Sequence, residues 1–491
     1  MERVKNYIDG KWVESTSGRL LEIRNPATGD LIGQVPMSTR EELDQCVAAA
    51  GKAYDSWRRT PAVTRCRYLF RFKELVERQI NEIAGIITLE HGKEFRAAVG
   101  EVRRLAEMVE VASGVTTTMM GDYTQDVAPS IDEYTIRVPL GVFAVIPPFN
   151  FPGMVPYWFM PWAIAAGNTY IVKNNEQCPL TQHYLFSLLD QAGFPPGVVN
   201  LINGDRECAE WIMDHPEIKG VSFVGSSAVA RVIYERCGRN GKRVQAQGGA
   251  NNFILVMPDA DLKGIMPNLM ESCFGNSGQR CLAGSVILAL GDDYERVRDA
   301  VVDAASRLKV GNGLDESVDM GPVISRKALD KLHADVDRAI AEGARLLLDG
   351  RGINVEGCPE GYFMGPTILE AEPGMYIFDE EIFGPVVCLK RVESFDQAVR
   401  LINSSRYGNA SSIYTRNGHW AREFRFDVVA GNIGINVGVP AAMAFYPFGG
   451  MKESFFGALH GQGKDAVAFF TDQKLVIERW MMEKGLRERW F

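Results

Sequence analysis

Between Gly141 and Val224 the sequence alternates short apolar runs with longer amphipathic segments, and few folds fit this alternation. The apolar runs have the length of strands: GVFAVIPP, NTYIVKN, VVNLIN and VSFV. Helical patterns such as TQHYLFSLLDQAG and RECAEWIMDH separate them. Strands that are apolar on both faces and alternate with helices predict a parallel, doubly wound sheet. Such a sheet binds ligands beyond the carboxyl ends of its strands.

A second alternation begins near Asn252. The runs FILVMP and VILAL indicate strands, and YERVRDAVVDAASRL and ALDKLHADVDRAIAEGARLL indicate helices. A chain of 491 residues is also too long for one ordinary hydrophobic core. We therefore predict an α/β protein with two doubly wound α/β domains.

The flanking segments carry weaker signals. The first 36 residues read as short strands joined by turns, and Ser38-Thr-Arg-Glu41 reads as a capping box before a helix. Two further helical patterns cover roughly residues 62–90 and 94–113. The tail DAVAFFTDQKLVIERW ends in a β-branched stretch, which indicates either an edge strand exchanged between subunits or a strand within its own subunit.

Composition excludes several classes of protein. Acidic residues exceed basic ones by 62 − 53 = 9 and no long basic run occurs, so we expect no nucleic acid partner. The N-terminus has no secretory h-region, and the longest apolar stretch (154–167) is short and broken by prolines, so we expect no membrane span. Nine scattered cysteines without a CxxC pair favour a reducing compartment, and six histidines with no i, i+4 pair give no metal site.

Two strand ends suggest where a dinucleotide binds. In VSFVGSSAVARVIYERC a strand ends at Val224, and Ser226 opens a helix whose free amides suit a pyrophosphate, although Ser226 also fits a plain N-cap. Lys173 and Glu176 leave a neighbouring strand, where they can grip a ribose or be solvated loop charges. A carboxylate there repels a 2′-phosphate, which favours NAD over NADP. The one GxGxxA match, at 461–466, follows no clear strand, and we treat it as chance.

The stretch SCFGNSGQRCLAGS (272–285) raises the question of a nucleophile. Cys281 follows a Gly-Gln-Arg turn and precedes small residues, whereas most free cysteines are small buried hydrophobes. We assign Cys273, eight residues earlier, to the core. Arg280 is expected to favour the thiolate of Cys281, since a nearby cation lowers a thiol pKa.

At this point the chain resembles a known family over nearly its whole length. The segments PPFNFPGMVPYWFMPWAIAAGNTYIVKNNE, FVGSS, GQRC and EEIFGPV occur in the order and spacing of the aldehyde dehydrogenase superfamily. Within it the chain is most similar to the CoA-acylating methylmalonate-semialdehyde dehydrogenases. The features that point there are PFNFP, MMG at 119–121, GKRVQA at 241–246, VMPDA at 256–260 and the Arg-Cys pair at 280–281.

The resemblance implies a set of cofactor-binding residues. Lys173 and Glu176 match the clamp on the adenosine ribose, and Glu381 matches the carboxylate that holds the nicotinamide ribose. The full set implied for NAD is Pro147, Phe149, Lys173, Glu176, Gln177, Ser226, Gly248, Glu381 and Phe383.

The resemblance also implies the chemistry. Cys281 matches the catalytic nucleophile, whose attack on an aldehyde gives a thiohemiacetal that can release a hydride. Asn150 matches the side-chain donor of the oxyanion hole, and the backbone N–H of Cys281 is its partner. Loss of the hydride leaves a thioester on Cys281.

Release of that thioester depends on Gln247. Hydrolytic relatives carry a glutamate 34 residues before the nucleophile, where this chain has Gln247. An amide cannot take a proton from water, so the resemblance implies acyl transfer to coenzyme A. A hydrolytic enzyme that uses a substitute base such as His460 stays open. The acylating relatives usually carry asparagine and lysine where Gln247 and Asn251 stand, and Gly248 replaces a larger residue; these departures bear on the substrate more than on the reaction.

A semialdehyde that carries a carboxylate needs a cation in its pocket. Arg280 is one candidate, and Arg103 or Arg104, in EVRRLAEMVE, is another by resemblance. The two helix arginines also fit a solvated face. If the substrate is a β-carboxy aldehyde, its thioester can lose CO₂ before transfer.

The expected organisation follows from the same comparison. Residues 1–122 and 138–249 form an NAD-binding domain, residues 250–448 a catalytic domain, and residues 123–137 and 466–484 a small β oligomerisation arm. We expect a homodimer or homotetramer in the cytoplasm, or in the mitochondrial matrix if the source is eukaryotic, although no transit peptide is visible.

Overall fold

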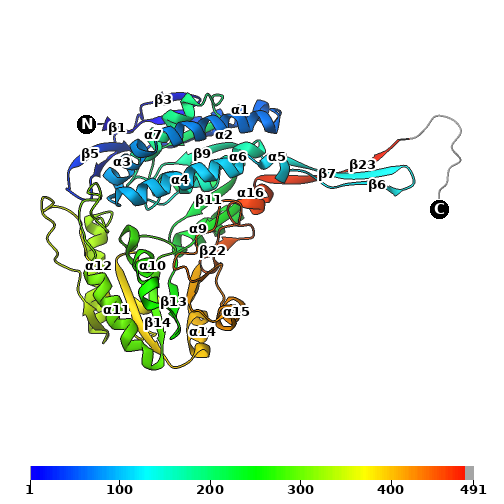
Figure 1. The fold of residues 1–491 in the computed structure, drawn as a ribbon. Coiled ribbons are helices and arrows are strands. Elements are labelled where there is room, and N and C mark those ends of the chain that lie inside the picture. The colour runs from blue at the N-terminus through cyan, green and yellow to red at the C-terminus, as the bar shows by residue number, and fades with distance from the viewer. Residues whose placement is uncertain (1, 481–491) are drawn as a thin grey trace.

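The protein consists of two α/β lobes and a narrow β-arm that projects to one side (Figure 1). The structure is a computed structural model, and it describes residues 2–480. Each lobe is built around one largely parallel sheet. The predicted fold class, with two doubly wound domains and an arm, is confirmed.

The first lobe contains an eight-stranded sheet. Its central strands are parallel, and the outer strands β22, β2 and β3 run antiparallel to their neighbours. In sheet order the strands are β22 (Phe455–Gly457), β12 (Arg243–Gln247), β11 (Ile218–Val224), β8 (Val142–Ile146), β9 (Thr169–Lys173), β10 (Val199–Ile202), β2 (Asn6–Ile8) and β3 (Lys11–Val13).

Two helical layers cover this sheet, because its central strands are buried on both faces. Along β8, Val142, Ala144 and Ile146 face one layer, and Phe143 and Val145 face the other. The first layer comprises α1 (Arg40–Trp57), α8 (Arg206–Asp214) and α9 (Ser227–Arg239). The second comprises α2 (Ala62–Arg78), α3 (Ile80–His91), α4 (Phe95–Ala112), η1 (Val155–Trp158), α6 (Met160–Ala166) and α7 (Leu180–Gln191).

The second lobe repeats this plan with seven strands, all parallel except β15. In sheet order they are β15 (Arg345–Leu348), β16 (Thr367–Glu370), β17 (Val386–Val392), β14 (Gly284–Leu290), β13 (Asn252–Val256), β19 (Ala410–Tyr414) and β20 (Asn432–Ile435). One face packs on α10 (Leu262–Phe274) and α11 (Tyr294–Ser306). The other packs on α12 (Arg326–Ala341), α13 (Tyr376–Asp379), α14 (Phe395–Ser404) and α15 (Gly418–Asp427).

Smaller elements complete the described chain. Near the N-terminus three strands form a separate sheet, and a two-stranded ladder lies close to the C-terminal end of the second lobe. These elements are β1 (Glu2–Arg3), β4 (Leu20–Arg24) and β5 (Leu31–Pro36), β18 (Tyr407–Gly408) and β21 (Met451–Lys452), and the short helices α5 (Val115–Thr118), η2 (Gly275–Gly278) and η3 (Gly291–Asp293).

The arm is a three-stranded antiparallel sheet of β6 (Tyr123–Ala128), β7 (Ile131–Pro139) and β23 (Thr471–Arg479). Strand β23 pairs with β7 of its own chain along nine residues, from Thr471 opposite Pro139 to Arg479 opposite Ile131. Residues 466–470, which we expected in the arm, belong to helix α16 (Gly463–Phe470), which packs on α6. Residues 481–484 of the expected arm lie outside the described residues.

Two local predictions are wrong in detail. The capping box of α1 is formed by Thr39 and Glu42, one residue later than predicted, because the Ser38 hydroxyl bonds to Asn6 instead. The helical pattern at 62–90 is split into α2 and α3 by Gln79, whose φ of −120° is not helical. Neither difference moves the strands that carry the site.

None of the helices among residues 2–480 has the length and apolarity needed to cross a bilayer. Within the same residues, no cluster of three or more His, Cys, Asp or Glu side chains is arranged to hold a metal ion.

Candidate active site

Cys281 lies between the two lobes, on a tightly wound turn that joins α10 to β14. The turn contains three consecutive left-handed residues, Asn276, Ser277 and Gly278, with φ of 54°, 53° and 69°. Beyond it, the carbonyl of Cys281 accepts hydrogen bonds from the side-chain amides of Asn252 (3.0 Å) and Asn409 (2.7 Å). The backbone that carries the thiol is therefore held from both sides.

All nine cysteines are free thiols, and Cys281 alone among them is half-buried, since the other eight are buried. Cys273 is in the core of the second lobe, as predicted. The accessible position of Cys281 comes from two cavities that meet at its side chain. A thiol with access to two cavities can contact two different ligands at once.

The larger cavity, of about 930 Å³, lies at the carboxyl ends of β8, β9, β11 and β12, and we name it the strand-end cavity. It brings together the whole set of residues that the resemblance implied for the cofactor. These are Pro147, Phe149, Lys173, Glu176, Gln177, Ser226, Gly248, Glu381 and Phe383.

Lys173 and Glu176 form an ion pair at one end of the strand-end cavity, with Nζ and Oε2 2.7 Å apart. Ser226 is the N-cap residue of α9, yet its side chain makes no capping hydrogen bond. Its exposed hydroxyl and the first amides of α9 therefore remain available to an anion. This arrangement suits the ribose and the pyrophosphate of a dinucleotide.

The other end of the strand-end cavity holds Glu381 and Gly248. Glu381 accepts a hydrogen bond from the Ala250 backbone N–H (3.0 Å), and burial raises the pKa of its carboxyl to about 7. A Cβ at Gly248 would lie 2.5 Å from the carbonyl oxygen of Glu453, so only glycine fits there. The backbone at Gly248 thus borders the cavity without a side chain in the way.

Asn150 is held by contacts that the sequence did not reveal. Its side-chain Nδ2 donates to the carbonyl of Gln279 (2.9 Å), which leaves the second N–H of the amide uncommitted. Its own carbonyl accepts from Lys93 Nζ (2.6 Å), and Lys93 pairs with Glu101 at 2.7 Å. Glu101 in turn accepts from the backbone N–H of Gly153 (2.7 Å).

Lys93 and Glu101 are both buried, with side chains 1% and 0% exposed, so their ion pair fixes the loop that carries Asn150. The only sequence signal was a lysine and a glutamate eight residues apart in a segment that otherwise reads as an ordinary amphipathic helix.

Arg280 lowers the pKa of the Cys281 thiol, as expected, but it does not offset the other influences on that thiol. Burial and the carboxylate of Glu381 raise the pKa, and the net value is about 12. Arg280 has a closer partner, because its guanidinium pairs with Glu271 at 2.7 Å. In this state Cys281 is a neutral thiol, and it needs an additional positive charge or a proton acceptor to react.

Gln247 ends strand β12 and is 3% exposed. Its Nε2 donates to the carbonyl of Phe448 (2.9 Å), and its Oε1 has no hydrogen-bond partner. The residue is not among those that line either cavity, although its neighbour Gly248 lines one and Phe448 lines the other. The uncharged amide of Gln247 therefore lies next to residues of both cavities without lining either.

His460, the candidate substitute base, is placed elsewhere. Its Nε2 lies 3.2 Å from the carbonyl of Gly450, its Nδ1 lies 3.5 Å from Asp465, and its ring packs on Phe455. It is absent from the lining of both cavities at Cys281.

The smaller cavity, of about 590 Å³, runs along α4, and we name it the α4 cavity. Arg280 and Arg104 both line it, and each is paired with an acid: Arg280 with Glu271, and Arg104 with Glu107 at 2.5 Å. Arg103 does not reach it.

Arg103 is exposed and lines a shallow depression with Glu77 and Tyr184. Successive residues of a helix point about 100° apart, so only one of two neighbouring arginines can face the cavity. The prediction for Arg103 is therefore corrected, and Arg104 remains.

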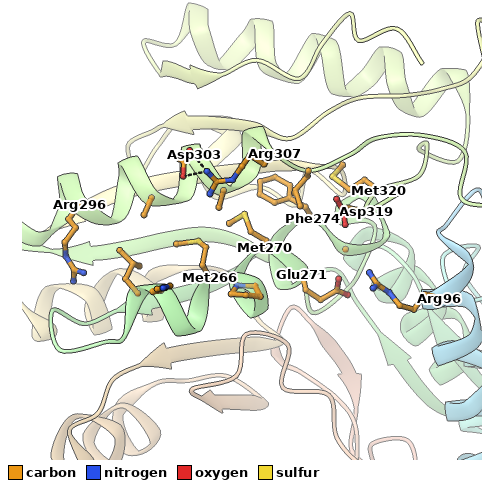
Figure 2. A pocket seen from close by; sticks show the side chains of 17 residues that line it. Arg96, Met266, Met270, Glu271, Phe274, Arg296, Asp303, Arg307, Asp319 and Met320 are labelled. Carbon is orange, nitrogen blue, oxygen red and sulfur yellow. Dashed lines mark hydrogen bonds and ion pairs between the residues drawn. The ribbon is translucent and has the colours of Figure 1, made fainter. Parts of the chain in front are cut away.

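Sequence reasoning also missed three residues of the α4 cavity. Glu94, Arg96 and Gln462 line it, and Gln462 lies within the GxGxxA match at 461–466, on the side of the site away from the strand ends. Arg96 and Glu271 line a further cavity of about 780 Å³ between α10 and α11 (Figure 2). Both residues also line the α4 cavity, so the two cavities adjoin. Methionines and Phe274 supply much of the wall of this further cavity.

This site can be compared with known proteins. The sequence profile of the aldehyde dehydrogenase family matches residues 12–476. The chain belongs to the aldehyde dehydrogenase family. Its membership confirms the predicted resemblance, and the half-buried thiol between two cavities lies in the matched region.

Among curated relatives, a malonate-semialdehyde dehydrogenase of Halalkalibacterium halodurans is 44% identical over 480 residues, which cover 98% of this chain and 99% of the relative. Malonate-semialdehyde dehydrogenase 3 of Geobacillus kaustophilus is 45% identical, with 97% and 99% covered. Among solved structures, the methylmalonate-semialdehyde dehydrogenase of Oceanimonas doudoroffii is 40% identical, with a TM-score of 0.96 and 98% and 99% covered.

A second structure is a protein from Sinorhizobium meliloti, provisionally assigned as a methylmalonate-semialdehyde dehydrogenase and complexed with NAD. It is 38% identical to this chain, with a TM-score of 0.97 and with 98% and 99% of the two chains covered.

Proposed function

We propose that this protein oxidises a short semialdehyde bearing a carboxylate, of the malonate or methylmalonate semialdehyde type, with NAD as the oxidant and coenzyme A as the acyl acceptor. The observation that carries the proposal is a half-buried thiol, Cys281, at the meeting point of a dinucleotide-sized cavity and an arginine-lined cavity. The relatives named above support the class of substrate.

The strand-end cavity fits NAD. Lys173 and Glu176 would hold the adenosine ribose, Ser226 and the first amides of α9 the pyrophosphate, and Glu381 the nicotinamide ribose. The carboxylate of Glu176 disfavours a 2′-phosphate, as in NADP. When bound, NAD supplies an acceptor for the hydride that leaves the substrate carbon.

Cys281 would act as the nucleophile. The thiol proton passes to solvent, the sulfur attacks the aldehyde carbon, and the carbonyl oxygen becomes an oxyanion. One free N–H of the Asn150 amide and the Cys281 backbone N–H would stabilise that oxyanion. Because the pKa of the Cys281 thiol is raised, the reactivity of this thiol depends on the positive charge that bound NAD⁺ brings into the strand-end cavity.

Gln247 would leave the resulting thioester intact. A general base typically accelerates a reaction about 10² to 10⁴-fold, and neither the amide of Gln247 nor the distant His460 provides one. The thiol of coenzyme A is a better nucleophile than water, so it takes the acyl group and restores the Cys281 thiol.

Arg104 and Arg280 would orient the substrate through its carboxylate, since both guanidiniums line the α4 cavity. A thioester with a β-carboxylate can lose CO₂ before transfer, because the thioester carbonyl stabilises the enolate that forms.

The test is product analysis by mass spectrometry, with malonate semialdehyde and methylmalonate semialdehyde, NAD, and with or without coenzyme A. We expect NADH and an acyl-CoA, with multiple turnovers only when coenzyme A is present. Free acid formed at a rate indifferent to coenzyme A would replace this proposal with the hydrolytic alternative. The mass of the acyl-CoA shows whether CO₂ is lost.

We further propose that residues 1–122 and 138–249, with β22, form the NAD-binding domain and residues 250–448 the catalytic domain. The arm would join copies of the chain in a homodimer or homotetramer, since Leu475 and Ile477 on β23 are about 60% exposed. Light scattering of a L475K/I477K variant tests this, with a smaller assembly as the expected result.

We propose a cytoplasmic location. Nine free thiols suit a reducing compartment, and the curated relatives cited above are bacterial. Cell fractionation with an antibody against the protein checks it.

A further inference from the structure

Glu94 is a buried acid in the α4 cavity for which neither the fold nor the proposed chemistry gives a use. It is 4% exposed, it lines the cavity, and its Oε2 has no hydrogen-bond partner. It stands at the N-cap position of α4, where glutamate is not a preferred capping residue, and its side chain makes no capping hydrogen bond. One oxygen of its carboxyl group therefore remains unpaired at the wall of the cavity.

The cations around Glu94 are already committed. Lys93, the preceding residue, pairs with Glu101 of α4, and Arg280, on the nucleophile turn, pairs with Glu271 of α10. Arg96, the second residue of α4, lines the same cavity but is exposed to solvent. Glu94 thus has no counterion of its own in a buried position.

A buried carboxyl without a counterion keeps its proton more readily. Burial raises the pKa of Glu94, Glu271 raises it further, and Arg280 and Lys93 lower it in part. A neutral carboxyl is a hydrogen-bond donor, whereas an ionised one only accepts. Next to a substrate carboxylate, the first form attracts and the second repels.

We propose that Glu94 is a specificity-determining residue, whose carboxyl group donates a hydrogen bond to the carboxylate of the semialdehyde beside Arg280 and Arg104. The proposal rests on the carboxylate-bearing substrate of the proposed function. The proton stays on Glu94 throughout, so the residue takes no part in the chemical steps.

The proposal predicts how binding depends on pH. As pH rises through the pKa of Glu94, the free enzyme loses the proton, and the substrate carboxylate then meets a negative charge. The KM for the semialdehyde therefore rises with pH, and binding above that pKa takes up one proton. An arginine-only site would show neither effect in this pH range, because guanidiniums stay protonated.

The test compares three proteins, E94Q, E94A and the wild type, by KM and kcat for malonate semialdehyde between pH 5 and 9. The amide in E94Q still donates but cannot ionise, so its KM stays near the low-pH wild-type value and no longer rises with pH. E94A loses a hydrogen bond to a charged group, which raises KM about ten- to hundredfold at low pH. The selectivity for malonate semialdehyde over propanal falls by the same factor, while kcat changes little.

Arg103→Ala is the matched control, because it changes the same helix on its exposed face. A second readout is calorimetry of 3-hydroxypropanoate binding at pH 8 in two buffers of different ionisation enthalpy. Proton uptake by the wild type and none by E94Q is the expected result.

An unchanged selectivity in E94A, or a pH profile of E94Q that matches the wild type, overturns the role of Glu94. If E94A does not fold, the E94Q profile and proton uptake decide alone. A wild type that shows no preference for malonate semialdehyde over propanal instead overturns the proposed function, so the two failures are distinct.

Discussion

The two cavities that meet at Cys281 are built in different ways. The strand-end cavity is made by the carboxyl ends of parallel strands and the start of one helix, and the pair Lys173–Glu176 stands at its far end. The α4 cavity is made by side chains from several elements, and three separate ion pairs contribute to its walls: Lys93–Glu101, Arg280–Glu271 and Arg104–Glu107. The backbone thus shapes one half of the site, and a side-chain network shapes the other.

The largest effect should come from removing the sulfur of Cys281, which borders both cavities. We expect C281A to lower NADH formation by about 10⁴-fold or more, as removal of a nucleophile does in other enzymes that form acyl intermediates. The measurement is absorbance at the NADH band with saturating aldehyde and NAD. C273A is the control, because its thiol lies in the core. Unchanged oxidation by C281A would mean that neither cavity serves this thiol.

The next largest effect should come from Gln247, whose neighbours line the two cavities. We expect Q247E to form free acid without coenzyme A about 10² to 10⁴-fold faster than the wild type, because a carboxylate can take a proton from water. Mass spectrometry of the products measures it. Q473E on the exposed arm makes the same chemical change at a distance and should leave the products unaltered. A Q247E enzyme that still needs coenzyme A would show that position 247 does not govern release.

The side-chain network of the α4 cavity should be the more fragile half. K93M removes one partner of a fully buried pair and leaves Glu101 without a counterion, which typically costs about 3–5 kcal/mol. We also expect a lower kcat, since the Asn150 carbonyl loses its donor. K73M, at the more exposed pair Lys73–Glu77, should cost about 0–1 kcal/mol. Urea unfolding measures both, and equal losses would contradict the distinction.

The smallest effect should appear in the strand-end cavity. Burial raises the pKa of Glu381 to about 7, so the carboxylate is mostly protonated at pH 6 and mostly ionised at pH 8. An ionised carboxylate accepts hydrogen bonds from ribose hydroxyls more strongly, and the KM for NAD should therefore fall severalfold as pH rises from 6 to 8. E381Q should remove this slope. Because the fold holds this proton longer than the unfolded chain does, the same group lowers stability as pH rises from about 4.5 to 7.

The difference between the cavities also explains what the sequence could predict. Residues of the strand-end cavity could be predicted from the sequence, because apolar runs mark the strands and parallel strands bring their carboxyl ends to one edge of the sheet. Every residue expected there lines it. Strand position placed Lys173, Glu176 and Ser226, whereas the family resemblance placed the other six, among them Glu381 and Phe383, which lie beyond α13.

Residues of the α4 cavity were harder to predict from the sequence, because the contacts of this cavity join residues that are far apart in the chain. Nothing near Lys93 in sequence indicates that it bonds to Asn150, 57 positions away. The choice between Arg103 and Arg104 depended on the rotation of α4, which a helical pattern fixes only to within a residue. The sequence showed the cation beside Cys281, but it did not show the burial that raises the pKa of the thiol.

The close contact between Gly278 and Gly384 has a mechanical consequence. The turn before Cys281 and the loop of Glu381 meet so closely that a methyl group at Gly278 would lie 2.0 Å from the oxygen of Gly384. The turn that carries Cys281 and the loop that carries Glu381 are therefore in direct backbone contact, with no side chain between them. Any displacement of the Cys281 turn must therefore displace the Glu381 loop, so the sulfur of Cys281 and the carboxylate of Glu381 move together.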